Sequence, residues 1–465
     1  MLDILIVLSA LLFLTIVAYR GYSVILFAPV AALLAVFLSG PSLVLPFYSG
    51  VFMERAAVFL KLYFPIFLLG AVFGKLMDVS GFARSIIHAL ASVMKPSQAM
   101  LSIVLVCAVL TYGGVSLFVV AFAVYPFAAE LFRTAGIPKR LIPATIALGA
   151  FTFTMDALPG SPQIQNLIPT TFFKTDAWAA PWLGLSGAVF LFLTGMLYLE
   201  WRRRQAARAD ESYGPVDVDA SNPADIGGLP HPLLAALPLV LVGVLNKLLT
   251  SRIASGYGLK FDFAAHGIPG PVAIEVASVS ALWAVQIALF CAIVVIVATA
   301  WRKIRLTFQA ATGSAVSGAI LACLNTGSEY GFGAVIALLP GFRAINGFLS
   351  RTIEDTLLNI AVTTNVLAGI TGSASGGLSI VLGSLGQTYA ERAQAGGIPL
   401  EVVHRIAAMA SGGMDTLPHN GAVITLLAIT GLTHRESYPD IFVMTIFKVA
   451  AAFFAIVLYR LFGLQ

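Results

Sequence analysis

The feature that most constrains this chain is the recurrence of long apolar stretches that carry almost no charge. They occupy residues 4–19, 24–38, 183–199, 232–249, 279–300 and 441–459. Of the 465 residues, 59% are apolar and only 11% are charged, whereas a soluble domain carries about 25% charged residues. About 20 residues of α-helix cross the hydrocarbon core of a bilayer, and the stretches lack the alternation of barrel strands. We therefore predict an all-α polytopic membrane protein surrounded by lipid.

The first apolar stretch is expected to be a membrane span rather than a cleaved signal peptide. It places Asp3 where a signal peptide has basic residues, and it lacks a small-x-small cleavage site. The three cysteines, Cys107, Cys291 and Cys323, lie apart in apolar segments. We therefore expect neither a disulfide nor a metal site.

One polar segment, residues 201–231, divides the chain and is expected to be a linker outside the membrane. It is rich in Asp, Ser, Pro and Gly, and the basic run EWRRRQAAR at 200–208 opens it. Basic residues beside spans mark the cytoplasmic side, so we place the linker in the cytoplasm. The basic residues that give the net charge of +5 cluster beside spans, where they orient the protein in the membrane. We expect no nucleic-acid partner.

The two halves on either side of the linker, 1–200 and 232–465, resemble each other. GGVS at 113–116 recurs as GGLS at 376–379, and MDALPGSPQ at 155–163 recurs as MDTLPHNGA at 414–422. These pairs keep nearly the same separation along the chain, which indicates a structural duplication.

Each half is expected to contain five crossings and one re-entrant helical hairpin. Three spans come first (3–19, 22–39 and 56–78; then 232–250, 279–301 and 310–341), followed by a hairpin (about 98–132; about 354–391), a broken helix (about 138–175; about 399–431) and a last span. An odd number of crossings inserts the second half upside down. Inverted repeats with broken helices near the midplane are typical of secondary transporters.

The hairpin tips and the breaks carry the small polar residues that we expect to bind substrate. Half-helix N-termini that meet there offer N–H groups and positive dipole ends, which suit a carboxylate. The alternative is that glycine and serine serve only helix packing, but their recurrence in both halves favours binding. The candidate substrate-binding residues are Thr111, Gly113, Gly114, Ser116, Gly160, Ser161, Gln163, Ser373, Ser375, Gly376, Gly377, Thr416, His419 and Asn420.

Three acidic residues inside apolar segments are candidates for ion coupling, namely Asp156, Asp415 and Glu329. An ionisable group in the membrane is costly and therefore marks function, although an Asp before Leu-Pro can simply end a helix. The chain has no GxxxxGK[ST] motif and no plausible catalytic set. We therefore expect an ion gradient as the energy source, no cofactor and no enzymatic activity.

Three motifs resemble the gluconate permease (GntP) family of the ion transporter superfamily: NTGSEYGFGAVIALLPGF, TGSASGGLSI and ASGGMDTLPHNGAVITLL. The resemblance covers most of the chain and is strongest over 320–430. It implies a bacterial inner-membrane proton symporter for small organic acids. It also implies a homodimer with a scaffold domain and an elevator-type transport domain, the latter built from the hairpins and broken helices.

The first break departs from the gluconate members of that family. They carry a run of the type Pro-Pro-His-Pro-Gly-Pro, where this chain has Leu-Pro-Gly-Ser-Pro-Gln at 158–163. Gluconate, 3-hydroxybutyrate, lactate and citrate therefore remain candidate substrates. No Arg falls at a tip or break in the sequence, which favours a monocarboxylate. Sodium in place of the proton, and an ion exchanger without an organic substrate, remain alternatives.

Overall fold

A computed structural model describes residues 2–20, 22–93, 98–115, 117–214, 229–258, 260–267, 273–371, 373–414, 416–418 and 420–465. In chain order the helices are α1 (Leu2–Tyr19), α2 (Val24–Ser39), α3 (Val44–Phe47), α4 (Glu54–Val79), α5 (Phe82–Val93), α6 (Ala99–Tyr112), α7 (Leu117–Thr134), α8 (Ile142–Ala150), α9 (Phe153–Asp156), α10 (Ile164–Phe173), α11 (Pro181–Arg208), α12 (Pro232–Tyr257), α13 (Val276–Ile304), α14 (Phe308–Leu338), α15 (Pro340–Thr352), α16 (Thr356–Thr371), α17 (Ala374–Ala395), α18 (Leu400–Gly413), α19 (Gly421–Thr430) and α20 (His434–Phe462). Short turns of other helix types are η1 (Pro41–Leu43), η2 (Tyr48–Met53), η4 (Lys139–Leu141) and η5 (Ala264–His266).

The chain folds into a bundle of helices, several of which are long and apolar enough to cross a membrane. Among the described residues, five segments meet both criteria: Pro41–Val79, Pro181–Arg208, Pro232–Tyr257, Val279–Ile304 and His434–Phe462. Their outward faces carry large exposed apolar side chains, such as Leu193, Leu237 and Phe290. Such a surface is stable only against lipid or another protein, so the molecule is embedded in a membrane.

The long helices α4 and α14 pack against each other. Each also packs against a helix from the other half of the chain. Helix α2 lies on α14, and α13 lies on α4. The close approach depends on small residues in α14. A Cβ at Gly327 would lie 2.5 Å from Leu60, and one at Gly331 would lie 2.8 Å from the carbonyl of Phe52.

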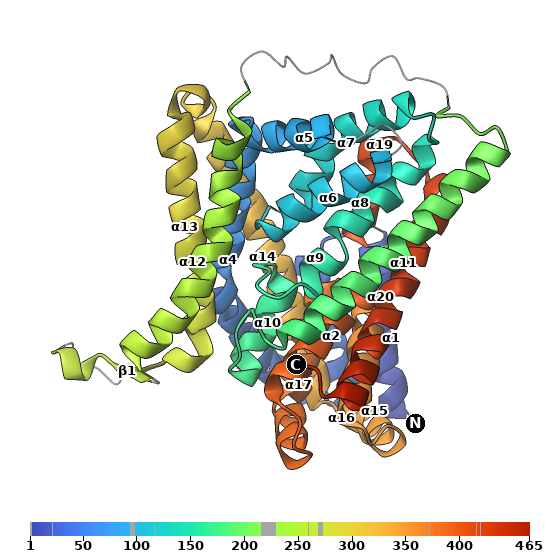
Figure 1. Cartoon of the computed structure of the whole chain (residues 1–465). Helices are drawn as coiled ribbons and strands as arrows, with labels where there is room; N and C mark the ends of the chain where they lie inside the picture. The colour runs from blue at the N-terminus through green and yellow to red at the C-terminus, as the bar shows by residue number, and fades with distance from the viewer. Residues whose placement is uncertain are drawn as a thin grey trace.

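The two hairpins consist of α6 with α7 and of α16 with α17, and they lie at opposite ends of the molecule (Figure 1). The first arms have 14 and 16 residues, or roughly 21 and 24 Å at 1.5 Å per residue. These arms are too short to cross the core of a bilayer. In the second hairpin the arms touch closely, since a Cβ at Gly377 would lie 2.3 Å from the backbone of Ala368.

Helices end and begin again on either side of two proline-containing segments. The first separates α8 and α9 from α10, and the second separates α18 from α19. In the first break Gly160 adopts a φ of 79°, a left-handed conformation that favours glycine. The breaks leave backbone groups of the flanking half-helices to be satisfied by side chains.

Three local features differ from the sequence expectations. Two short amphipathic helices, α5 and α15, connect the third span of each half to its hairpin. Helix α11 continues to Arg208, so the first part of the expected linker is helical. Strands β1 (Lys260–Asp262) and β2 (Ala273–Glu275) form an antiparallel pair between α12 and α13, a small exception to the all-α expectation.

The amphipathic helices are covered by helices from the other half of the chain. Helix α12 packs on α5, and α1 packs on α15. In α5, Phe82 and Ile86 are buried whereas Arg84 is exposed. The start of α1 lies directly on Gly341 of α15, where a Cβ would be 2.0 Å from the carbonyl oxygen of Asp3.

Candidate functional site

The tip of the first hairpin is tied to the first break by hydrogen bonds from two side chains, Gln163 and Tyr112. Gln163 Nε2 donates to the carbonyl of Thr111 over 2.7 Å, and the hydroxyl of Tyr112 donates to the carbonyl of Pro159 over 2.8 Å. The Thr111 hydroxyl is buried and has no hydrogen-bond partner within the described ranges. The structure thus brings together the first tip and the first break, and the role of Thr111 in substrate binding stays a prediction.

The glycines of this tip lie against apolar side chains. A Cβ at Gly113 would lie 2.3 Å from Leu239 of α12. Gly114 has a φ of 95°, and a Cβ there would lie 3.3 Å from Pro162. Both glycines therefore serve close packing here, and their assignment to substrate stays a prediction.

The indole ring of Trp178 packs against the first break. A Cβ at Gly160 would lie 2.4 Å from Trp178, and the carbonyl of Gly160 accepts a 3.3 Å hydrogen bond from Asn246 of α12. The ammonium of Lys247 lies 4.6 Å from the centre of the Trp178 ring. The neighbouring Ser161 is buried and donates to the carbonyl of Thr154 over 2.7 Å.

The tip of the second hairpin holds a carboxylate. Ser373 caps α17 by accepting a 3.0 Å hydrogen bond from the backbone N–H of Gly376, and Ser375 lies beside it with its hydroxyl 3.4 Å away. Glu329 of α14 points at this helix start, because a Cβ at Gly376 would lie 1.9 Å from Glu329 Oε2. Ser373 also hydrogen-bonds the carboxyl group of Glu329. A negative group is favoured at this position by the N-terminal dipole of α17.

The second break lies against the second hairpin and α20. A Cβ at Gly369 of α16 would lie 3.0 Å from Met414. The hydroxyl of Thr416 lies 2.6 Å from that of Thr445, and Asn420 caps α19 by accepting the N–H of Ala422 over 2.7 Å. Of the predicted site residues, Ser116, Asp415 and His419 lie outside the described residues.

A buried ion pair lies where the first break meets the end of α18. Lys448 Nζ is 3.9 Å from Asp156 Oδ2, and both side chains are at most 2% exposed. The ammonium also donates a 2.6 Å hydrogen bond to the carbonyl of Phe151, which caps the C-terminus of α8. Gly412 makes room for the pair, because a Cβ there would lie 1.8 Å from Asp156 Oδ2.

A second buried cation, Arg405, holds the segment that follows the first break. Its guanidinium donates to the carbonyls of Ala177 and Ala179 and to the side chain of Asn166, with N···O distances of 2.7 to 3.3 Å. His404 adds a contact of 2.6 Å to Thr175. The N–H groups of Arg405 are hydrogen-bonded to backbone and amide oxygens, so Arg405 has a structural role in this arrangement.

Sequence reasoning missed Lys448 and Arg405, although both carry a usable signal. Each is a lone charge in an apolar helix, in TIFKVAAAF and VVHRIAAMA. The same reasoning that selected Asp156 applies to them, because isolated charge at membrane depth is costly. No Arg lies within a break along the sequence, but the fold brings one to the first break, since Arg405 reaches it from α18.

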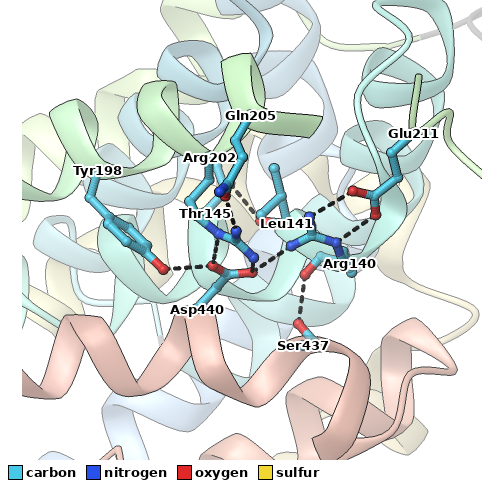
Figure 2. A network of polar contacts seen from close by, with 9 residues as sticks. All are labelled: Arg140, Leu141, Thr145, Tyr198, Arg202, Gln205, Glu211, Ser437 and Asp440. Atoms are coloured by element: carbon cyan, nitrogen blue, oxygen red, sulfur yellow. Dashed lines mark hydrogen bonds and ion pairs between the residues drawn. The ribbon is translucent and has the colours of Figure 1, made fainter. Parts of the chain in front are cut away.

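A separate polar network joins η4, α11 and α20 (Figure 2). Asp440 is 1% exposed and accepts hydrogen bonds from Arg140 (2.9 Å), Arg202 (2.6 Å) and Tyr198 (2.7 Å). Arg140 also makes a double contact with Glu211, and this lowers the pKa of the Glu211 carboxyl group. The network fixes the start of the first broken helix to the last span.

Comparison with known proteins is consistent with this arrangement. No protein-family model matches the chain. The chain is 54% identical over 471 residues to the "Uncharacterized transporter YxjC" of Bacillus subtilis (strain 168), covering 99% of this chain and 100% of that protein. Its fold is similar to the crystal structure of the Alcanivorax borkumensis YdaH transporter, with a TM-score of 0.54, 14% identity and 88% of each chain covered.

The match extends over nearly the whole chain, and so over the segments that form the hairpins and both breaks. Helices that span a membrane, interrupted near a buried polar centre, form the arrangement expected of a transporter. The chain therefore belongs to the transporter family of Bacillus subtilis YxjC.

Proposed function

We propose that this transporter takes up a small organic acid anion by proton symport across the bacterial inner membrane. The substrate class is a hydroxy-monocarboxylate such as gluconate or 3-hydroxybutyrate. The proposal includes membership of the gluconate permease family, on the strength of the motifs quoted above, and the homodimer that this resemblance implies.

The observation that carries the proposal is the position of Glu329 at the start of α17. Its carboxylate lies against Gly376, is 6% exposed, and leaves Oε2 without a hydrogen-bond partner in the described part of the chain. A helix N-terminus attracts anions through its N–H groups and dipole. The second tip is thus already adapted to a carboxylate, which here belongs to the protein.

This position suggests how a proton and an anion are coupled. While Glu329 is ionised, its negative charge competes with a substrate carboxylate for the start of α17. Protonation of Glu329 removes the charge, and the substrate carboxylate takes its place beside Ser373. One proton then accompanies one monocarboxylate, and the pair crosses the membrane without net charge.

The packing of the helices supports an inverted repeat. Contacts recur in matching pairs: α2 on α14 with α13 on α4, α10 on α17 with α19 on α7, and α12 on α5 with α1 on α15. The matching hairpins lie at opposite ends of the molecule (Figure 1). We assign the hairpins and broken helices to a mobile transport domain and the long helices α4, α12, α13 and α14 to a scaffold.

The use of Arg405 supports a monocarboxylate. Recognition of a di- or tricarboxylate usually needs a guanidinium that offers two parallel donors. Arg405 gives its donors to the carbonyls of Ala177 and Ala179 and to Asn166. It would have to release these groups before it could hold a second carboxylate.

The test is uptake of labelled gluconate and 3-hydroxybutyrate into proteoliposomes, with proton and sodium gradients imposed separately. We expect accumulation with a proton gradient alone. Uptake that follows only a sodium gradient would favour the sodium-coupled alternative. Absence of any organic anion uptake, together with cation exchange, would favour the exchanger.

Glu329→Gln tests the coupling role, because glutamine resembles the protonated acid. The variant should still exchange labelled for unlabelled substrate, but it should not accumulate substrate on a proton gradient. Glu54→Gln, at an exposed position at the start of α4, is the control and should behave like the wild type. Proton-driven accumulation by Glu329→Gln at the wild-type level would refute the role of Glu329.

A further inference from the structure

The end of helix α8 has the chemistry of a cation site. A helix C-terminus leaves its last carbonyls without partners inside the helix, and it carries a partial negative charge. Two of these carbonyls are bound by threonine hydroxyls, since Thr152 donates to Leu148 and Thr154 donates to Gly149. The carbonyl of Phe151, the capping residue, points to the buried space between α8 and α20.

Asp156 supplies a full negative charge to the same space. It is the last residue of α9, is 1% exposed, and lies against Gly412 of α18. A carbonyl at a half-helix C-terminus together with a buried carboxylate is the kind of donor set with which broken helices of transporters hold a coupling cation.

In this chain the space is filled by the ammonium of Lys448. Its Nζ lies 2.6 Å from the carbonyl oxygen of Phe151 and 3.9 Å from Asp156 Oδ2. The side chain is 1% exposed and comes from α20, which packs on both α8 and α18. The lysine thus brings one positive charge to the place where a sodium ion would bring the same charge.

We infer that Lys448 is a tethered cation that occupies the cation site at the first helix break, so that transport by this protein is independent of sodium. A tethered ammonium stabilises the break as an ion would, but it cannot leave to the other side of the membrane. A sodium gradient therefore cannot drive transport through this site. The inference rests on the proposed function in one respect only, the use of organic anion uptake as a readout.

The helices packed around Lys448 differ in the charged groups that they carry. Helices α8 and α16 contain no titratable side chain. In α18, Arg405 and His404 are engaged with the segment around residues 166–179. In η4 and at the end of α11, Arg140 and Arg202 contact Asp440, while Glu200 pairs with Arg203 and Arg204. Asp415 is outside the described residues.

The test is replacement of the tethered cation by a soluble one. Lys448→Ala removes the ammonium and leaves Asp156 and the Phe151 carbonyl facing a small empty site. In a buffer whose only cation is choline, which is too large to enter, uptake should fall about tenfold or more, because a buried charge has lost its partner. Sodium or methylammonium in the buffer should restore uptake, and the wild type should respond to neither.

A thermal unfolding assay in detergent gives a readout that needs no substrate. Sodium or methylammonium should raise the melting temperature of Lys448→Ala but not that of the wild type, because a ligand that binds only the folded state stabilises it. The double variant Lys448→Ala/Asp156→Asn is the control. It lacks both charges, and its melting temperature should not respond.

The outcomes separate the inference from the proposed function. Wild-type uptake that requires sodium, or a folded Lys448→Ala whose uptake and melting temperature respond to no small cation, would overturn the tethered cation. A lack of organic anion uptake by the wild type, with the expected melting-temperature response in Lys448→Ala, would overturn the proposed substrate class and leave the tethered cation standing.

Discussion

The network around Asp440 predicts a large loss of stability when its carboxylate is neutralised. Asp440 is 1% exposed, while Arg140 and Arg202 are 21% and 20% exposed. In Asp440→Asn both guanidinium groups keep their charge but lose the anion between them. The side-chain shape is retained, so the effect should report the charge and its hydrogen bonds (Figure 2).

The expected size of the effect follows from the partners that remain. Breaking a buried ion pair by removing one side costs about 3–5 kcal/mol, because the other charge stays buried. Arg140 keeps its double contact with Glu211, and Arg202 keeps Gln205. We therefore expect the lower end of that range, about 3 kcal/mol in the free energy of unfolding.

The assay is unfolding in mixed micelles, monitored through the loss of tertiary structure. The loss of stability in Asp440→Asn is compared with the loss in a variant of an exposed ion pair. Glu130 and Arg133 form a salt bridge with side chains 62% and 52% exposed, and Glu130→Gln should cost less than about 1 kcal/mol. Adding Arg202→Met to Asp440→Asn should recover part of the loss, since it removes the unpaired charge. Equal losses for Asp440→Asn and Glu130→Gln would refute the reasoning.

Three further predictions concern other parts of the molecule. Gly160→Ala should destabilise the fold by about 1–3 kcal/mol in the same unfolding assay, because the left-handed backbone is strained and the new Cβ meets Trp178. Arg405→Lys should lower the yield of folded protein on size exclusion, because one ammonium cannot replace the several donors of the guanidinium. Arg140 lowers the pKa of Glu211, so this carboxylate stabilises the fold above its unfolded pKa of about 4.3, and the contribution is lost as the pH falls through the lower folded pKa. The melting-temperature difference between wild type and Glu211→Gln should therefore be present at neutral pH and vanish in acid.

The long helices and both breaks could be predicted because their signals are local. Apolar length sets a span, and proline with glycine at 159–160 sets a break. The short amphipathic helices were not predicted, because a helix such as α5 has only 12 residues and lies between two apolar segments. Their burial also depends on helices from the other half of the chain.

The buried charges could be predicted as residues of interest but not as partners. Lys448 and Phe151 are 297 positions apart, and Arg405 lies 226 positions from Ala179. The recurring motifs indicate a repeat, but they do not show which side chains so far apart come into contact. Lys448 lies near a carboxylate and a backbone carbonyl, whereas Arg405 binds backbone carbonyls and an amide oxygen. This difference depends on which oxygens the fold brings within reach.

The packing of α12 on α5 and of α13 on α4 has a consequence for how the protein is made. Helix α5 ends at Val93, whereas α12 begins only at Pro232. At a synthesis rate of about 5–20 residues per second, the early helices wait on the order of ten seconds for their partners. During that interval the ribosome holds a chain whose inner surfaces face lipid or insertion factors. A chain that stops before α12 can therefore never cover α5 with that helix, and the cell's quality-control proteases should recognise it as unfinished.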